Sequence, residues 1–295
     1  MKRILTYKID EKNSGKTIEK FLKEQGYSHA VMVALKKTEY GITRNGKWAY
    51  TNEKLNNNDK IQTTILENEF DENIEPIFLP LDIIFEDDDL LVINKPANMP
   101  IHPSMKNHDN TLANALMYYF KAQNTAFTFR CINRLDRDTT GLTIIAKHAL
   151  SGALLSQAVS KHEIKRTYNA ICEGCVPLYG TIDAPIARKS DSTIERCINF
   201  ESGEKAITHY KNLHYNSEKN LSLVELKLET GRTHQIRVHM KHEGFPLIGD
   251  FLYNPNYEHI KRQALHSKSL SFVHPITKKK MYFEAPLPLD MKRIL

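Results

Sequence analysis

The sequence predicts an α+β fold, mainly from the order of its strand-like and helix-like segments. Strand patterns come in runs, as in 81–95 and 221–229, rather than in strict alternation with helices, which favours an α+β sheet over a doubly wound one. Val224, Leu226 and Leu228 alternate with charged residues, as expected for a half-buried strand. Apolar side chains at helical spacing predict helices within 112–120 and 150–158.

The first 70 residues have the pattern of a small separate module of mixed α and β structure. Apolar residues at 18, 21 and 22 predict one short helix, and Ser28 is a suitable N-cap for a second. Asn45-Gly46 lies between two strand-like runs and predicts a type I′ hairpin turn. The arrangement resembles the alpha-L RNA-binding module. The resemblance implies an RNA surface near Lys36, Lys37 and Arg44.

Charge is unevenly distributed along the 295 residues. The net charge is +6 overall, with +4 in residues 1–70, −8 in residues 71–92 and +10 in the remainder. Two basic blocks joined by an acidic segment are typical of a protein whose two parts both meet a polyanion, and RNA or DNA is favoured. Pro76 and Pro80 interrupt regular structure. We therefore expect a module over 1–70, a linker over 71–80 and a catalytic domain over 81–295.

Composition also restricts the cellular setting. No apolar run reaches 18 residues, so no transmembrane helix is expected. The N-terminal residues have no long apolar segment of the kind found in secretory signals. Four cysteines without such a signal favour a reducing cytoplasm over a disulfide framework, and Cys172 and Cys175 have no matching pair that would complete a zinc site.

The string NRLDRDTTG, residues 133–141, concentrates the chemistry and allows three interpretations. A calcium loop fits Asp136 and Asp138, but the position that needs an acidic ligand is Lys147. A haloacid-dehalogenase-like phosphatase would use the same D-x-D-x-T string with magnesium, and GDFLYN (249–254) half-fits its later motif. However, no buried apolar strand precedes Asp136, so this hypothesis is the runner-up. The third interpretation is one working carboxylate in a basic RNA site.

This third interpretation is supported by a resemblance to the RluA-type pseudouridine synthases. NRLDRDTTG is similar to the R-L-D-x-D-T-[ST]-G motif of that family. Four further blocks resemble family motifs in order: INKPANMPIHPS (93–104), IKRTYNAICEG (164–174), ETGRTHQIRVHMKHEGFPLIGDFLYN (229–254) and RQALHSKSLSFVHPIT (262–277). The resemblance covers about residues 80–290, and five ordered blocks are far more specific than any one of them.

The resemblance implies the fold, the reaction and the catalytic group. It implies a long, mixed and mostly antiparallel sheet with flanking helices, across which the RNA cleft lies. The implied enzyme isomerises uridine to pseudouridine within RNA, without a cofactor or metal, as a cytoplasmic and monomeric protein. Asp136 matches the catalytic carboxylate, Arg237 the arginine that pairs with it, and Tyr168 the active-site tyrosine. Attack on the sugar, attack on the base and assistance of deprotonation by Asp136 all remain open.

The other site residues are expected to shape the loop or to bind RNA. Asp138 is expected to shape the loop rather than react. Ribosomal RNA is favoured over tRNA because of the added N-terminal module, by analogy alone. A non-catalytic RNA-binding or assembly factor is the other alternative. Residues assigned to RNA binding in the larger domain are Arg134, Arg137, Lys165, Arg232, His234 and Gln235.

Overall fold

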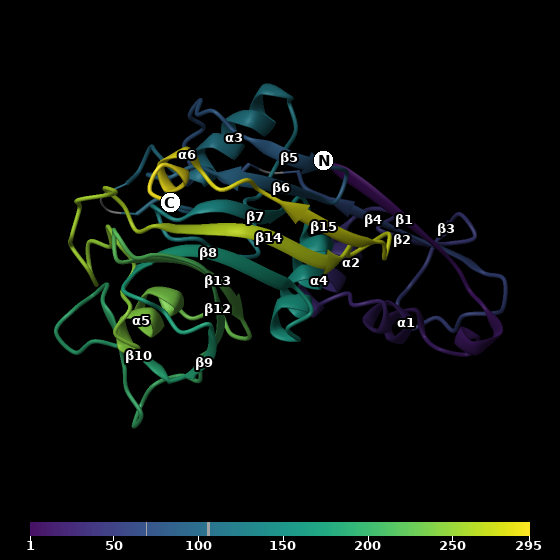
Figure 1. Ribbon diagram of the computed structural model, residues 1–295. Coiled ribbons are helices and arrows are strands. Elements are labelled where there is room, and N and C mark those ends of the chain that lie inside the picture. Colours follow the sequence, from purple (N-terminus) through teal and green to yellow (C-terminus); the bar gives the residue numbers. More distant parts are fainter. Residues whose placement is uncertain (69, 105–106) are drawn as a thin grey trace.

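The computed structural model describes residues 1–68, 70–104 and 107–295, and confirms the α+β class. Its strands form a nine-stranded sheet, a four-stranded sheet and a two-stranded ribbon. Figure 1 shows the four-stranded sheet at one end of the long one. Within these described ranges, no helix is both long and apolar enough to cross a membrane.

The nine-stranded sheet has the order β5-β6-β7-β14-β8-β13-β12-β9. The ninth strand, β15, pairs with the C-terminal half of β14, from Ser269 to Val273. All its pairings are antiparallel except β7 with β14. The mixed and mostly antiparallel sheet expected from the sequence is therefore confirmed. Its strands are β5 (Ile83–Glu86), β6 (Leu90–Lys95), β7 (Thr140–Ala146), β8 (Lys165–Glu173), β9 (Tyr179–Asp183), β12 (Ile207–Asn216), β13 (Leu221–Leu228), β14 (Leu265–Val273) and β15 (Lys280–Glu284).

The helices cover both faces of this sheet. On β6, Leu91 and Ile93 face the apolar cluster that contains α3, whereas Leu90 and Val92 face the cluster that contains α4. Helix α5 packs on the same face as Tyr168, and α6 belongs to a cluster on the other face. The alternation of strand side chains therefore builds two cores from one sheet. The helices are α3 (Leu112–Ala122), α4 (Ala149–Ser160), α5 (Gln235–His242) and α6 (Leu289–Lys292).

The four-stranded sheet has the order β1-β4-β2-β3, and two helices cover one of its faces. Ser28 accepts a hydrogen bond from the backbone N–H of Val31, which confirms the predicted N-cap. Asn45 and Gly46 both have positive φ (51° and 82°), as a type I′ turn requires. Its elements are β1 (Lys2–Lys8), a 3₁₀ turn (Glu11–Asn13), α1 (Ile18–Glu24), α2 (His29–Lys37), β2 (Ile42–Arg44), β3 (Lys47–Trp48) and β4 (Lys60–Leu66).

Strand β1 was not predicted from the sequence, and it ties the N-terminal sheet to the rest of the chain. Arg3 donates two hydrogen bonds to Asp89, at 2.8 and 3.1 Å. Glu67, just after β4, accepts the backbone N–H of Ala149 at 2.8 Å and a hydrogen bond from Arg130 at 3.0 Å. Leu150 of α4 belongs to the core of the N-terminal sheet. The N-terminal sheet is therefore docked on the start of α4.

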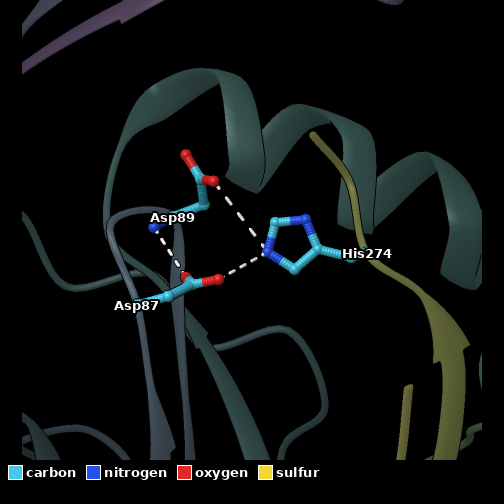
Figure 2. Close-up of side chains that lie close together, drawn as sticks. All are labelled: Asp87, Asp89 and His274. Carbon is cyan, nitrogen blue, oxygen red and sulfur yellow. Dashed lines mark hydrogen bonds and ion pairs between the residues drawn. The ribbon is translucent and has the colours of Figure 1, made fainter. Parts of the chain in front are cut away.

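Asp87, Asp89 and His274 lie close enough together to suggest a cation site (Figure 2). His274 Nε2 donates to Asp87 at 2.8 Å, while its Nδ1 accepts two backbone N–H groups of the following turn. Asp89 already receives hydrogen bonds from Arg3 and His148. These atoms are therefore used in a junction that joins β1, the β5–β6 turn, α4 and the end of β14.

The Asp89 carboxylate gives this junction a testable pH dependence. Burial alone would raise the pKa of Asp89, but hydrogen bonds from His148 and Arg3 outweigh burial and lower this pKa to about 2. Because the pKa is lowered by folding, the contribution is present above about pH 4 and is lost as the pH falls toward 2. We expect Asp89→Asn to reduce the free energy of unfolding by about 2 kcal/mol at pH 7.

Urea unfolding of the wild type and the variant at pH 7 and at about pH 3, between the unfolded and folded pKa values, measures this difference, which should shrink at the lower pH. Asp88 is the matched control because its side chain is 77% exposed, although it lies 3.2 Å from Arg3. Asp88→Asn should leave the stability nearly unchanged. Equal losses in the two variants would contradict the proposed junction.

Candidate active site

Residues 133–139 form a loop that leads directly into β7, and two features of the sequence fix its path. The Asn133 side chain donates to the carbonyl of Leu142 at 3.1 Å and accepts the N–H of Ile144 at 2.8 Å. Gly141 has φ +105°, and a Cβ there would lie 2.3 Å from the carbonyl oxygen of Ser267 on β14. Only glycine therefore permits β7 to meet β14 at this point.

Lys95, the last residue of β6, binds the backbone of this loop. Its ammonium is fully buried and donates to three backbone carbonyls, including that of Arg137 at 2.9 Å. Burial lowers the pKa of Lys95 to about 7, and the nearby carboxylates of Asp138 and Asp136 oppose this shift. Asp138 accepts the backbone N–H of Asn98 at 3.1 Å, in agreement with the loop-shaping role expected of it.

Asp136 meets Arg237 at the tip of this loop. Arg237 Nη1 donates to Asp136 Oδ2 at 2.8 Å. The same guanidinium donates from Nε and Nη2 to the two oxygens of Asp250, at 2.6 and 2.7 Å. Arg237 and Asp250 are almost fully buried, whereas the Asp136 side chain is 28% exposed. The buried carboxylate of Asp250 therefore fixes one side of the guanidinium, and the other side faces the accessible carboxylate of Asp136.

Asp250 does not stand out as a functional residue in the sequence, where it belongs only to the string GDFLYN. Burial alone would lower the pKa of Arg237, but the hydrogen bonds that it donates to Asp250 and the charge of Asp136 raise that pKa above its usual value. The guanidinium also lies 5.4 Å from the ring centre of Phe251 and 5.0 Å from that of Tyr253. The segment after α5 thus surrounds the arginine with a counter-charge and two aromatic rings.

Tyr168 lies on β8, next to the same loop. It is only 5% exposed, and burial raises the pKa of its phenol, so the hydroxyl keeps its proton near pH 7. Tyr168, Asp136 and Arg237 line one small cavity of about 60 Å³. The structure therefore brings together all three residues that the sequence assigned to catalysis.

A larger basic cleft of about 790 Å³ opens beside this cavity and shares Asp136 with it. Arg134, Arg232 and His234 line both spaces. His234 Nε2 lies 4.0 Å from Asp136 Oδ2, and its Nδ1 is 3.0 Å from the Tyr253 hydroxyl. Burial lowers the pKa of His234, so the ring is neutral near pH 7. The cleft can therefore attract a polyanion through its arginines.

Arg166 lines this cleft, whereas its neighbour Lys165, which the sequence assigned to RNA binding, does not. Alternate residues of a strand share a face, so Arg166 lies on the side of Tyr168 while Lys165 points the other way. Lys165 is exposed at the start of β8. Counting by two from Tyr168 would have selected Arg166 as the residue of β8 that lines the cleft.

Two other residues assigned to RNA binding have different surroundings. Arg137 donates to Asp138 at 2.8 and 2.9 Å and lines a separate cleft of about 770 Å³ beside Arg262. Gln235 is 2% exposed, and its amide bonds to Thr230 and to the carbonyl of Ile207. Gln235 therefore supports the turn before α5 from within the protein.

The three N-terminal residues assigned to RNA binding do not line the catalytic cleft. Arg44 forms an ion pair with Asp59 at 2.7 Å, and Lys36 lies 3.8 Å from Glu19. Lys37 is exposed at the end of α2. Any contact of these side chains with RNA would be made outside the site around Asp136.

The two cysteines of the C-x-x-C pair and the buried His239 have structural surroundings. Cys172 is buried and Cys175 is exposed, and both are free thiols. Burial raises the pKa of Cys172 above its usual value. His239 is fully buried between Thr208 and the carbonyl of Ala184.

Comparison with known proteins agrees with this geometry. Residues 89–242, about half of the chain, match the family described as RNA pseudouridylate synthase. The chain is 39% identical over 287 residues to "Uncharacterized RNA pseudouridine synthase YhcT" of Bacillus subtilis (strain 168), covering 97% of this chain and 94% of that relative. It is 42% identical over 232 residues to "Ribosomal large subunit pseudouridine synthase D" of Zymomonas mobilis, covering 74% and 73%.

Solved structures show the same likeness. "Human RNA Pseudouridylate Synthase Domain Containing 1" superposes with a TM-score of 0.59 at 26% identity, covering 70% of this chain and 83% of that one. Together with the sheet and the cleft, these comparisons define an RNA-modifying isomerase. The chain belongs to the RNA pseudouridine synthase family and, within it, to the RluA-type enzymes. The haloacid-dehalogenase-like alternative is thereby overturned.

The geometry around Arg237 predicts the effect of a lysine in its place. Lysine keeps the positive charge but replaces a planar fork that bridges two carboxylates with a single ammonium. We expect Arg237→Lys to lower kcat by about 100-fold with little change in KM, because the orientation of Asp136 is lost.

Steady-state kinetics on a substrate RNA would measure this effect. Arg232→Lys is the matched control, because Arg232 is an exposed arginine of the same cleft. The control should change KM more than kcat. An unchanged kcat in Arg237→Lys would show that Arg237 contributes only its charge.

Proposed function

We propose that this enzyme isomerises uridine in large-subunit ribosomal RNA, with Asp136 as the catalytic carboxylate. Arg237 orients Asp136, and Tyr168 contacts the uracil. The single observation that carries the proposal is the 2.8 Å contact of Arg237 with Asp136 at the junction of a small cavity and a basic cleft.

The chemistry needs few groups from the protein. The bond from C1′ to N1 breaks, a bond from C1′ to C5 forms, the C5 proton leaves and N1 gains a proton. Atoms and electrons therefore balance within the nucleoside, except for this proton transfer. A positioned carboxylate can act as a nucleophile or as a proton acceptor in such a sequence.

The contacts of Asp136 leave one oxygen for this work. Oδ2 accepts the hydrogen bond from Arg237, whereas no described residue donates a hydrogen bond to Oδ1. Tyr168, which lines the cavity, offers an aromatic face for the uracil and a protonated hydroxyl. A uridine in folded RNA must leave its stack to reach this point, which costs a few kcal/mol. Arg134, two residues before Asp136, is placed to bind the phosphate of the extruded nucleotide.

Ribosomal RNA is favoured as the substrate because of the relatives and the N-terminal module. Relatives that are 37–42% identical over about three quarters of this chain carry the name "Ribosomal large subunit pseudouridine synthase D". Two basic parts, the N-terminal module and the cleft, suit a large folded RNA that can meet both. Transfer RNA is the alternative substrate.

Pseudouridine mapping of transcripts treated with the purified chain tests this proposal. Large-subunit ribosomal RNA and a tRNA pool would be treated separately with wild type and with Asp136→Asn. We expect sites in the ribosomal RNA with the wild type and a rate at least about 1,000-fold lower with the variant. Glu229→Gln, which removes an exposed carboxylate from the same cleft, is the control and should retain activity. Modification confined to tRNA, or an active Asp136 variant, would refute the proposal.

Tyr168→Phe separates the ring from the hydroxyl. If the ring supports the uracil and the hydroxyl assists proton transfer, kcat should fall by about 10²-fold while KM stays within about threefold. Tyr168→Leu should lose the ring as well and weaken binding further. Single-turnover and binding measurements on one RNA would distinguish these effects. A fully active phenylalanine variant would rule out the role of the hydroxyl.

A further inference from the structure

We propose that the outer face of the N-terminal sheet binds an unpaired segment of the substrate RNA, with Trp48 as the stacking residue. This inference rests on the chain being an RNA-modifying enzyme. The outer face is the side of β1-β4-β2-β3 that lies away from α1 and α2. Its side chains come from Lys2, Ile4, Thr6, Lys8, Thr43, Trp48, Lys60, Gln62, Thr64 and Leu66.

The strand register places these side chains together. Thr6 pairs with Gln62, Gln62 with Thr43 and Thr43 with Trp48, and directly paired residues share a face. A hydrogen bond from the Gln62 amide to the Thr6 hydroxyl, at 3.2 Å, agrees with this arrangement. A row of polar side chains therefore crosses the sheet and ends at the tryptophan.

The charges of this face are of one sign. Lys8 pairs directly with Lys60, and like charges in this position destabilise a sheet. Within the part of the chain that the structure describes, Lys2, Lys8 and Lys60 form no ion pair, and the outer face carries no carboxylate. A polyanion would relieve the repulsion between the paired lysines.

Trp48 supplies an aromatic surface at the end of the row. Its side chain is 52% exposed on the short edge strand β3, and Tyr40, 53% exposed, lies 5.7 Å away between ring centres. Large aromatic side chains are usually buried, and exposed ones next to lysines are typical of surfaces that stack unpaired bases. Every base offers a face to such a ring, so the surface does not depend on sequence.

The aromatic pair also connects two basic regions. Tyr40 follows α2, which ends at Lys36 and Lys37, and Trp48 lies on the outer face, which also carries Lys60. A strand of RNA could therefore pass from the end of α2 around β3 to the outer face. An anionic membrane is the less favoured occupant, because Ile4 is the only aliphatic side chain of this face that is more than 36% exposed among the described residues.

Trp48 is the only tryptophan in the chain, so its fluorescence reports directly on this surface. The full-length protein would be titrated with an oligocytidylate of about twelve nucleotides, which offers no uridine to the active site. We expect quenching that saturates and that weakens as salt rises from about 50 to about 200 mM. Saturating binding detected by anisotropy without any change in Trp48 emission would contradict stacking.

Variants separate stacking from charge. Trp48→Ala should weaken binding of the oligonucleotide by at least about fivefold, and Trp48→Phe should largely restore it. The double variant Lys8→Glu/Lys60→Glu should lower the slope of log Kd against log salt by about 2. A double variant with the same charge change, Lys121→Glu/Lys211→Glu, replaces exposed lysines on α3 and β12 and should leave the fluorescence titration unchanged.

The outcomes distinguish this inference from the proposed function. If Asp136-dependent isomerisation persists but the outer-face variants bind RNA normally, the outer face is not an RNA site and the proposed function stands. Binding of the wild type to anionic phospholipid vesicles, with no response to RNA, would overturn the inference in favour of a membrane. Normal emission and urea unfolding of the lysine variant would confirm that it is folded.

Discussion

The buried guanidinium of Arg237 is the interaction on which the rest of the site depends. Removing a charged group from water is costly, and the cost is recovered only where the partners are fixed and the hydrogen bonds are complete. Asp250 accepts two of these bonds within the core and Asp136 accepts a third at the surface of the cavity. The arginine cannot turn away from Asp136 without leaving Asp250 partly unpaired. A structural ion pair therefore fixes the orientation of the accessible carboxylate.

This arrangement requires segments that are far apart in the sequence. The loop that carries Asp136 is fixed by Lys95 from β6 and by the contact of Gly141 with β14, while Arg237 comes from α5. β14 lies between β7 and β8 although it follows α5 in the chain. The strand that carries Tyr168 and the loop that carries Asp136 are therefore joined through β14, a strand from the C-terminal part of the chain. Figure 1 shows β14 in the middle of the sheet.

Local chemistry in the sequence was sufficient to predict much of this fold. The cap at Ser28, the turn at Asn45-Gly46 and the alternation in 224–228 each depend on neighbouring residues, and the structure confirms them. Strand β1 was missed because its partner β4 lies more than 50 residues away. The short ribbon of β10 (Ile186–Arg188) and β11 (Arg196–Ile198) was missed because each strand has only three residues.

The site was predictable to the extent that its residues stand in ordered motifs. Asp136, Tyr168 and Arg237 were assigned from such motifs, and they converge in space. Asp250 was missed because nothing in its neighbourhood in the sequence reveals that it faces an arginine thirteen residues earlier. Arg237 also departs from the usual expectation that an arginine on a helix is solvated, since α5 is buried on most of its sides. Both outcomes depend on tertiary packing.

A double-mutant cycle on Arg237 and Asp250 tests the central claim most directly. The reaction displaces the C5 proton, so release of tritium from RNA labelled at C5 of uridine measures turnover for the wild type, Arg237→Lys, Asp250→Asn and the double variant. If both residues act through the orientation of Asp136, the double variant should be no more than about threefold slower than the slower single variant. Losses that multiply would contradict the account, because Arg237 and Asp250 would then contribute independently.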